Sequence, residues 1–346
     1  MPITTKRRKT ASFTDIKAQL MKATLVLGSM AALSTSMLST TAQADTWRGW
    51  NIHPPGYPNT IALESFAKEV KEATDGRVSP KVYNNSILGD QTDAIEQVRN
   101  GALDFANFNM GPMGPIVPAT NVVSLPFIFK NIDHMHRVMD GEVGQRFAEA
   151  MAEKNLVALS WFDSGARSFY NTKHAIRTPD DVKGLKLRVM NNDLYVQMAD
   201  ALGGNATPMS YSEVFQSLKT GVIDGAENNY PSYESSNHFE VAGYFSLTQH
   251  LIIPECLCIS KRSWNALSES DQQAVREAAE HASTLQREEW TKRSEASREK
   301  VLAAGVSINE VDDKAAFQDR MTPIYERFVE QNPALADWVE AIQNTP

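Results

Sequence analysis

The sequence of 346 residues predicts an α/β protein built from two lobes with a cleft between them. Strand-like and helix-like segments alternate along most of the chain, which is the pattern of α/β architecture. The alternation restarts after Arg167, and a strand-like segment from Leu251 to Ser260 then returns to a new region. From about Ser268 to Ala304 the chain follows one long, highly charged helical pattern. These three observations predict two lobes and a long helix.

The first 44 residues have the pattern of a secretory signal peptide. Basic residues precede an apolar run from Ala23 to Leu38, and Ala42-Gln43-Ala44 places small residues where a signal peptidase reads them. We therefore expect export and cleavage after Ala44, before Asp45. The alternative is an uncleaved membrane anchor, but the run is shorter than the ~20 apolar residues that a span needs.

Cleavage would leave roughly 300 residues, which is enough for two ordinary domains. The removed segment carries a net charge of +5, so the formal net charge would fall from −8 to −13. A chain this acidic is not expected to bind nucleic acid or an anionic membrane surface.

We assign residues 45–166 to the first lobe, where short strands alternate with amphipathic helices. Asn59 can cap a helix whose apolar stripe contains Phe66, and Asp75-Gly76 ends that helix. The predicted strands are 46–53, 78–83, 103–109 and 156–162, and the predicted helices are 59–75, 91–100 and 132–154.

We assign residues 167–255 to the second lobe, which repeats the alternation. Ser210 starts a helix with Glu213 in the capping-box position. The predicted strands are 183–190, 222–223 and 251–260, and the predicted helices are 192–202, 210–221 and 233–242. Residues 256–346 then return to the first lobe with a hinge strand, the long helix 268–304, a strand at 306–311 and two final helices that bridge the lobes.

The chain is expected to cross between the lobes near 164–168 and 250–256. Lobes joined by several segments enclose a cleft, which is a favoured place for a small-molecule site.

Catalytic and metal-binding motifs are missing from the sequence. It has no nucleophile elbow, no H-E-x-x-H and no glycine-rich phosphate loop, and its seven histidines are scattered. We therefore expect no enzyme activity, no cofactor and no metal site.

The two cysteines, Cys256 and Cys258, stand in the segment PECLC. On a strand they share one face, but so short a loop makes a strained bridge. The sequence therefore favours two small buried thiols over a disulfide or a metal site.

Arg188 is the most informative residue, because it lies within the strand-like KGLKLRVM between Leu187 and Val189. Successive side chains of a strand point to opposite faces, so Arg188 points away from the face that its neighbours bury. A guanidinium cannot lose its charge and must reach solvent or an anion. Arg167, in SGARSFYN near the predicted lobe junction, could join it on one carboxylate, because the planar fork pairs with both oxygens. Either arginine could instead form an ion pair with the protein.

Four further polar residues stand at predicted strand ends or in apolar segments. Asn228 follows a strand in DGAENN and could bind hydroxyl groups, although a role in a turn is the alternative. Asn109 ends the strand ANFNM, and His53 closes the first strand, where α/β sites lie. Glu255, in the apolar IIPECL, could accept a hydrogen bond from a sugar hydroxyl or pair with an arginine.

Several segments together resemble one family. KGLKLRVM, MSYSEVFQSLKTGVIDGAENN and SLPFIF are similar to segments of the TRAP-transporter periplasmic solute-binding proteins, and the resemblance runs from about His53 to Ala304. HPPGYPN at 53–59 and LGDQTDAIEQVRNGALDFANFN at 88–109 resemble the branch that binds uronic acids such as glucuronate and galacturonate.

The resemblance implies a periplasmic-binding-protein-like fold, with hinge strands and a long helix across both lobes. It implies a periplasmic monomer that performs no chemistry and delivers an anion to the small and large membrane subunits of a TRAP permease. The carboxylate clamp of the family would fall on Arg188 and its second arginine on Arg167. Further ligand contacts would fall on Asn228, Asn109, His53, Gln91 and Glu255. Some relatives carry an acid where this chain has Gln91.

The residues and the resemblance together predict a polyhydroxylated mono-acid as ligand. One pair of arginines serves one carboxylate, and neutral or acidic hydrogen-bonding groups stand around it. A C4-dicarboxylate or another small organic acid is the alternative within the same class, but a dicarboxylate would need a second cationic site. A secreted α/β enzyme or a sensor domain is the alternative from another class.

Overall fold

The computed structural model of the chain describes residue 2, residues 45–311 and residues 313–346. The predicted signal peptide, residues 1–44, lies outside the described residues apart from Pro2.

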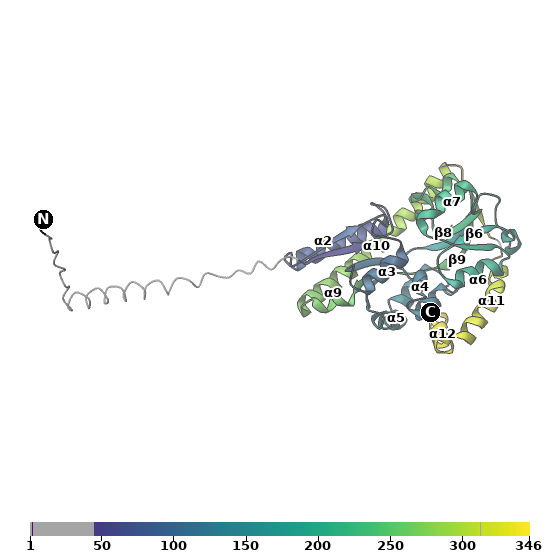
Figure 1. Cartoon of the computed structure of the whole chain (residues 1–346). Helices are drawn as coiled ribbons and strands as arrows, with labels where there is room; N and C mark the ends of the chain where they lie inside the picture. Colours follow the sequence, from purple (N-terminus) through teal and green to yellow (C-terminus); the bar gives the residue numbers. More distant parts are fainter. Residues whose placement is uncertain (1, 3–44, 312) are drawn as a thin grey trace. The chain divides into compact units, whose positions relative to one another are not determined.

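Two β-sheets organise the described part of the chain (Figure 1). The first sheet has five strands in the order β2-β1-β3-β10-β4, with bounds β1 Asp45–Trp50, β2 Val78–Tyr83, β3 Phe105–Asn109, β4 Leu156–Phe162 and β10 Glu255–Ser260. The second has six strands in the order β11-β9-β5-β8-β6-β7, with bounds β5 Ala166–Asn171, β6 Lys186–Val189, β7 Asn205–Pro208, β8 Gly225–Asn228, β9 Tyr244–Ile252 and β11 Ser307–Glu310. The predicted two-lobe α/β fold is confirmed.

Helices surround the two sheets. Their bounds are α2 Pro58–Ala73, α3 Gln91–Arg99, α4 Ile132–Met139, α5 Glu142–Ala152, α6 Asp193–Ala201, α7 Val214–Thr220, α8 Tyr230–Ser235, α9 Lys261–Ala266, α10 Glu269–Ala303, α11 Lys314–Gln331 and α12 Ala336–Asn344.

The predicted long helix is α10, which spans 35 residues. Ser268 caps it by accepting a hydrogen bond from the amide of Asp271, and Val275, Ala278 and Ala282 bury one stripe. The helix lies beside α2 of the first lobe (Figure 1). It also packs on β4 of the first lobe and on α8 of the second. It therefore joins the lobes, as the sequence predicted.

The chain changes sheet at both predicted crossings. It passes from the first sheet to the second between β4 and β5, and it returns between β9 and β10. The last strand, β11, pairs with β9 in the second sheet, so the segment 256–346 contributes to both sheets. The lobe bounds 45–166 and 167–255 stay predictions.

Two predicted strands are wrong in detail. The segment 251–260 is not one strand, because Pro254 has no amide hydrogen and separates β9 from β10. The strand predicted at 222–223 lies instead at β8. Gly221 ends α7 in the left-handed conformation, with φ of 74°, and leaves Val222 in a turn with an exposure of 58%.

Two predicted helices are also wrong in detail. The segment 132–154 forms two helices, α4 and α5, because Gly141 between them has an extended backbone. The helix predicted at 233–242 begins earlier and is shorter. Asn229 caps α8 by accepting a hydrogen bond from the amide of Ser232, and Pro231 lies in the first turn.

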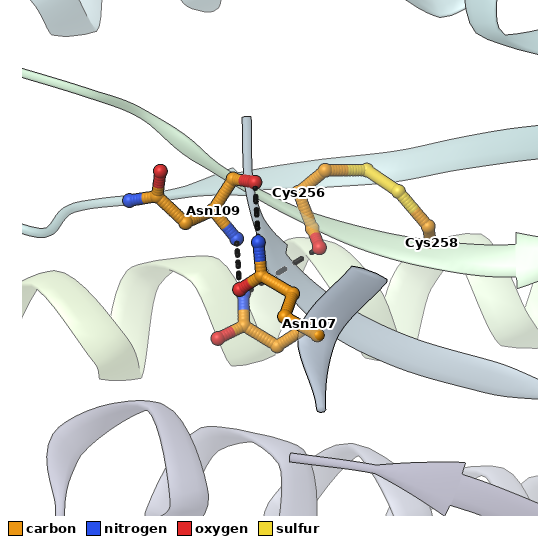
Figure 2. Close-up of a disulfide and its surroundings, with 5 residues drawn as sticks. Asn107, Asn109, Cys256 and Cys258 are labelled. Carbon is orange, nitrogen blue, oxygen red and sulfur yellow. Dashed lines mark hydrogen bonds between the residues drawn. A yellow bond between two sulfur atoms is a disulfide. The ribbon is translucent and has the colours of Figure 1, made fainter. Parts of the chain in front are cut away.

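Cys256 and Cys258 form a disulfide, so the expectation of two free thiols was wrong (Figure 2). A regular strand places residues i and i+2 about 6.6 Å apart. Here the register of β10 against β4 shifts between Leu257 and Cys258, and the two Cα atoms are 5.5 Å apart. That distance lies in the ordinary range of about 4.4–6.8 Å for disulfides. The two Cα atoms are thus closer at this irregularity than in a regular strand, and their distance is near the commonest value for disulfides.

Candidate functional site

A cavity of about 670 Å³, part of it open to solvent, brings together all seven residues that the sequence singled out. His53, Gln91 and Asn109 line it from the first lobe, Glu255 lines it from the start of β10 in the first sheet, and Arg167, Arg188 and Asn228 line it from the second lobe. Its volume lies in the range of small-molecule sites. Whether these residues contact a ligand stays a prediction at this point.

Arg188 is buried in the middle of β6, with only 4% of its surface exposed. Leu187 and Val189 pack into the core on either side of it, as the strand alternation predicted. Its Nε donates a hydrogen bond to the carbonyl oxygen of Met209 over 3.0 Å. Neither terminal nitrogen has a hydrogen-bond or ion-pair partner among the described residues, which leaves a fork of donors for an anion in the cavity.

Burial lowers the pKa of Arg188 from its ordinary value, and the negative charge of Glu227 opposes this effect. The guanidinium still carries its charge at neutral pH, because arginine is deprotonated only under extreme conditions.

Arg167 has a different role from Arg188, because the protein itself occupies most of its donors. Its Nη2 donates to Oε1 of Glu227 over 2.8 Å, its Nε donates to Oε2 of the same carboxylate, and its Nη1 donates to Oδ1 of Asn228 over 2.7 Å. Burial alone would lower the pKa of Arg167, but the charge and the hydrogen bonds of Glu227 raise it above its ordinary value. The pair is neutral as a unit, so the ion-pair alternative holds for this residue although it lines the cavity.

Asn228 and its neighbour Asn229 differ in their roles, which the sequence left open between lining the cavity and forming a turn. Asn228 accepts hydrogen bonds from Arg167 and from the amide of Asn229 and lines the cavity. Asn229 caps α8 and donates to the carbonyl oxygen of Ser164 over 2.9 Å. Asn229 is therefore the residue with the turn role.

His53 lies three residues after the end of β1, not at the end of the strand as predicted, and stacks on Tyr57, with ring centroids 3.7 Å apart and planes 4° apart. Both of its ring nitrogens are buried, and neither has a hydrogen-bond partner in the described part of the chain. Burial lowers the pKa of His53 to about 3, so the ring is neutral at physiological pH. A neutral imidazole with two unused nitrogens can donate one hydrogen bond to a ligand and accept another.

Gln91 and Asn109 form a unit. The side-chain amide of Gln91 donates to the backbone carbonyl oxygen of Asn109 over 3.0 Å and accepts from the backbone N–H of Asn109 over 3.3 Å. These are the two hydrogen bonds that the backbone of a neighbouring strand would make. The side chain of Asn109 accepts from the amide of Gly111 and donates to Glu255 over 3.4 Å. Gln91 therefore holds the backbone of Asn109, and the side chain of Asn109 points away from the cystine of β10 in Figure 2.

Glu255 begins β10 and is 5% exposed. Its Oε2 accepts a hydrogen bond from Asn59 over 2.8 Å, and Asn59 in turn accepts one from Gln286 of α10. No arginine lies within ion-pair distance of it among the residues described, so the arginine-pair alternative is wrong. Burial raises the pKa of Glu255 from 4.5 to about 7, although the amide of Asn109 and the charge of Arg167 partly oppose the shift.

Further polar residues of the cavity escaped the sequence analysis. Asp90 accepts a hydrogen bond from Ser210 over 2.5 Å, and this contact joins the start of α3 to the segment before η4, Tyr211–Glu213. Tyr211 lines the cavity and donates to the carbonyl oxygen of Ser232 over 3.1 Å. The capping pattern at Ser210 marked a helix start, but no local signal indicated its partner 120 residues away.

Within residues 45–311 and 313–346, no group of three or more histidine, cysteine, aspartate or glutamate side chains is arranged to hold a metal ion. No helix in the same part of the chain is long and apolar enough to cross a membrane.

Comparisons with known proteins identify the family. The family model of the bacterial extracellular solute-binding proteins, family 7, matches residues 51–332. A solute-binding protein of Chromohalobacter salexigens is 69% identical over 327 residues, which cover 94% of this chain and 96% of that protein.

Two solved structures extend the comparison to the fold. A TRAP periplasmic solute-binding protein of Chromohalobacter salexigens, with bound D-glucuronate, is 71% identical with a TM-score of 0.86. Another from Sulfitobacter, with bound β-D-galacturonate, is 53% identical with a TM-score of 0.86. Each match covers 87% of this chain and 100% of the other. The family match, the identity and the shared two-lobe fold agree: the chain belongs to family 7 of the bacterial extracellular solute-binding proteins, those of TRAP transporters.

Proposed function

We propose that this protein captures a hexuronate, D-glucuronate or D-galacturonate, in the cavity between its lobes and delivers it to the membrane subunits of a TRAP transporter. The relatives with bound hexuronates carry the proposal, above all the one that is 71% identical and holds D-glucuronate. The protein would act as a periplasmic monomer after cleavage of its signal peptide behind Ala44.

The chemistry of the cavity supports a single carboxylate. Arg188 offers two unoccupied terminal nitrogens, whereas Arg167 is balanced by Glu227. A second carboxylate would find no other unpaired cation in the described lining, which disfavours a C4-dicarboxylate. The planar fork of Arg188 fits the two oxygens of one carboxylate.

The remaining polar lining suits a ring with several hydroxyl groups. His53 offers a donor and an acceptor, Glu255 offers carboxyl oxygens, and Asn228 keeps its Nδ2 without a partner among the described residues. Removing a ligand hydroxyl would leave such a group unpaired and cost roughly 1–3 kcal/mol.

A thermal-shift panel of D-glucuronate, D-galacturonate, succinate, glucose and galactose tests the proposal. A hexuronate at ~100 times its dissociation constant should raise the free energy of unfolding by about 2.7 kcal/mol. The neutral sugars lack the carboxylate and are the matched controls, for which we expect no shift. A shift with succinate and none with either hexuronate would contradict the proposal.

A further inference from the structure

Glu255 differs from the other buried acids of the described chain. The side chains of six aspartates and glutamates are buried there: Asp163, Asp224, Glu227, Glu234, Glu255 and Asp271. Five of them have a basic side chain within 4.0 Å. Asp163 has His136, Asp224 has Lys173, Glu227 has Arg167, Glu234 has Arg293 and Lys300, and Asp271 has Arg77. Burying an ionised carboxylate without a cation is costly. Glu255 is the exception, and it lines the cavity.

The groups that touch Glu255 are neutral. Asn59 from α2 and Asn109 from β3 donate to its two oxygens, and Asn107 from β3 lies beside them. On the side of α10, Gln286 reaches it only through Asn59. Such amides can serve a carboxylate or a carboxylic acid, because both forms accept hydrogen bonds.

None of the charged groups described around Glu255 forms an ion pair with it, although the positive charge of Arg167 acts to lower its pKa. Arg167 on β5 is engaged by Glu227 on β8, and Arg188 on β6 and Asp90 before α3 line the same cavity. His53 and Tyr57, whose rings stack on each other, lie in the segment that precedes α2 in the chain. On the side of β4, Phe162 is paired with Glu255 in the sheet. The next residue in the chain, Asp163, has His136 as its ion-pair partner.

We propose that Glu255 takes up a proton from water when a sugar acid enters the cavity, and that it then donates a hydrogen bond to a ligand oxygen as a neutral carboxylic acid. The inference rests on the proposed function. A bound sugar acid brings a negative charge close to Glu255 and displaces water from around it. Both changes disfavour an ionised carboxylate.

The expected pH dependence follows from linkage. The pKa of Glu255 in the free protein is raised to about 7, and an anionic ligand raises it further. Below about pH 6, Glu255 is protonated in both states, so the dissociation constant is flat. Above about pH 7, binding must bring a proton, so the dissociation constant rises by up to about tenfold per pH unit.

His53, His250 and Tyr57 do not titrate between pH 6 and 8.5, because burial shifts their pKa values out of this window. Burial lowers the pKa values of His53 and His250 to about 3, so both rings are neutral in this window. Burial raises the pKa of Tyr57 well above its ordinary value, so its hydroxyl stays protonated.

Calorimetric titrations of the processed protein with D-glucuronate and with D-galacturonate test the inference. At pH 8 the binding enthalpy, measured in phosphate and in Tris, should differ by the ionisation enthalpies of the buffers times close to one proton taken up. Between pH 6 and pH 8.5 the dissociation constant should rise by about tenfold or more.

Two glutamine variants locate the proton. Glu255→Gln imitates the neutral acid, so it should bind without proton uptake and with a dissociation constant that does not change with pH. Glu234→Gln makes the same exchange at a buried, cation-paired acid outside the cavity and should keep the pH profile of the parent.

Each outcome has a definite meaning. Hexuronate binding that is independent of buffer and pH would overturn the inference and leave the proposed function intact. Proton uptake that persists in Glu255→Gln would overturn it as well, because another group would then carry the proton. Failure of the parent to bind any sugar acid would contradict the proposed function and the inference together.

Discussion

At the scale of single residues, the two arginines of the cavity look equivalent in sequence but differ in their surroundings. Arg167 donates hydrogen bonds to Glu227 and Asn228. Arg188 donates one hydrogen bond to Met209, and its terminal nitrogens have no partner among the described residues and line the cavity. The difference predicts that the carboxylate of the ligand depends on Arg188, and that Arg167 holds the neighbouring polar groups in place.

Arg188→Lys should raise the dissociation constant for a hexuronate by about 100-fold, because an ammonium keeps the charge but loses the fork and the bond to Met209. Titration calorimetry measures the change. Arg177→Lys makes the same exchange at an exposed position and should bind like the parent. An Arg188→Lys variant with the affinity of the parent would rule out a bidentate contact.

At the scale of elements, β10 combines a functional end with a covalently fixed middle. Glu255 starts the strand at the cavity, and the cystine Cys256–Cys258 follows in the core, where both side chains are fully buried. An exported protein meets oxidising conditions in which such a bridge persists.

Replacing both cysteines, as Cys256→Ala with Cys258→Ala, should lower the free energy of unfolding by about 2–4 kcal/mol. So short a loop contributes about 1.5 kcal/mol through the entropy of the unfolded chain, and lost packing of the buried sulfur atoms adds the rest. Urea unfolding measures the change. Alkylation of thiols in the denatured, unreduced parent would contradict the bridge itself.

At the scale of the whole molecule, hydrogen bonds between side chains join the two lobes, and we expect them to favour a form in which the lobes close on a ligand. Asp90 of the first lobe accepts from Ser210 of the second, and Tyr57 and Ser232 share a hydrogen bond of 2.9 Å. The first of these contacts involves a carboxylate, so it should stabilise the closed form by roughly 1.5–3 kcal/mol. A contact that favours closure strengthens the binding of every ligand that needs the closed form.

Asp90→Ala should therefore raise the dissociation constants for D-glucuronate and D-galacturonate by the same factor, about tenfold or more. The ratio of the two dissociation constants should stay unchanged. Asp90 makes no side-chain capping bond, so α3 should remain folded. Asp93→Ala removes an exposed acid from the first turn of the same helix and is the matched control. The test is to measure the dissociation constants for both sugar acids in the variant and in the parent. A changed ratio would indicate direct contact of Asp90 with a hydroxyl group and contradict the prediction.

The sequence predicted much of the fold because local patterns encode it. Strand alternation placed Arg188 opposite Leu187 and Val189, and the capping pattern at Ser268 placed the start of the long helix. Errors arose where an apolar run crossed a break, as at Pro254, and where the apolar Val222 lies in a turn.

The sequence by itself determined the α/β pattern, the strand that carries Arg188 and the seven polar residues that meet in one cavity. Only the tertiary structure decided what those residues do for one another. Glu227 neutralises Arg167 because β5 and β8 pair across 60 residues of chain, and the disulfide forms where the register of β10 shifts. Glu255 is left without an ion-pair partner among the described residues for the same reason: charge balance depends on distances in space, which strand pairing and lobe packing set and which local sequence does not encode.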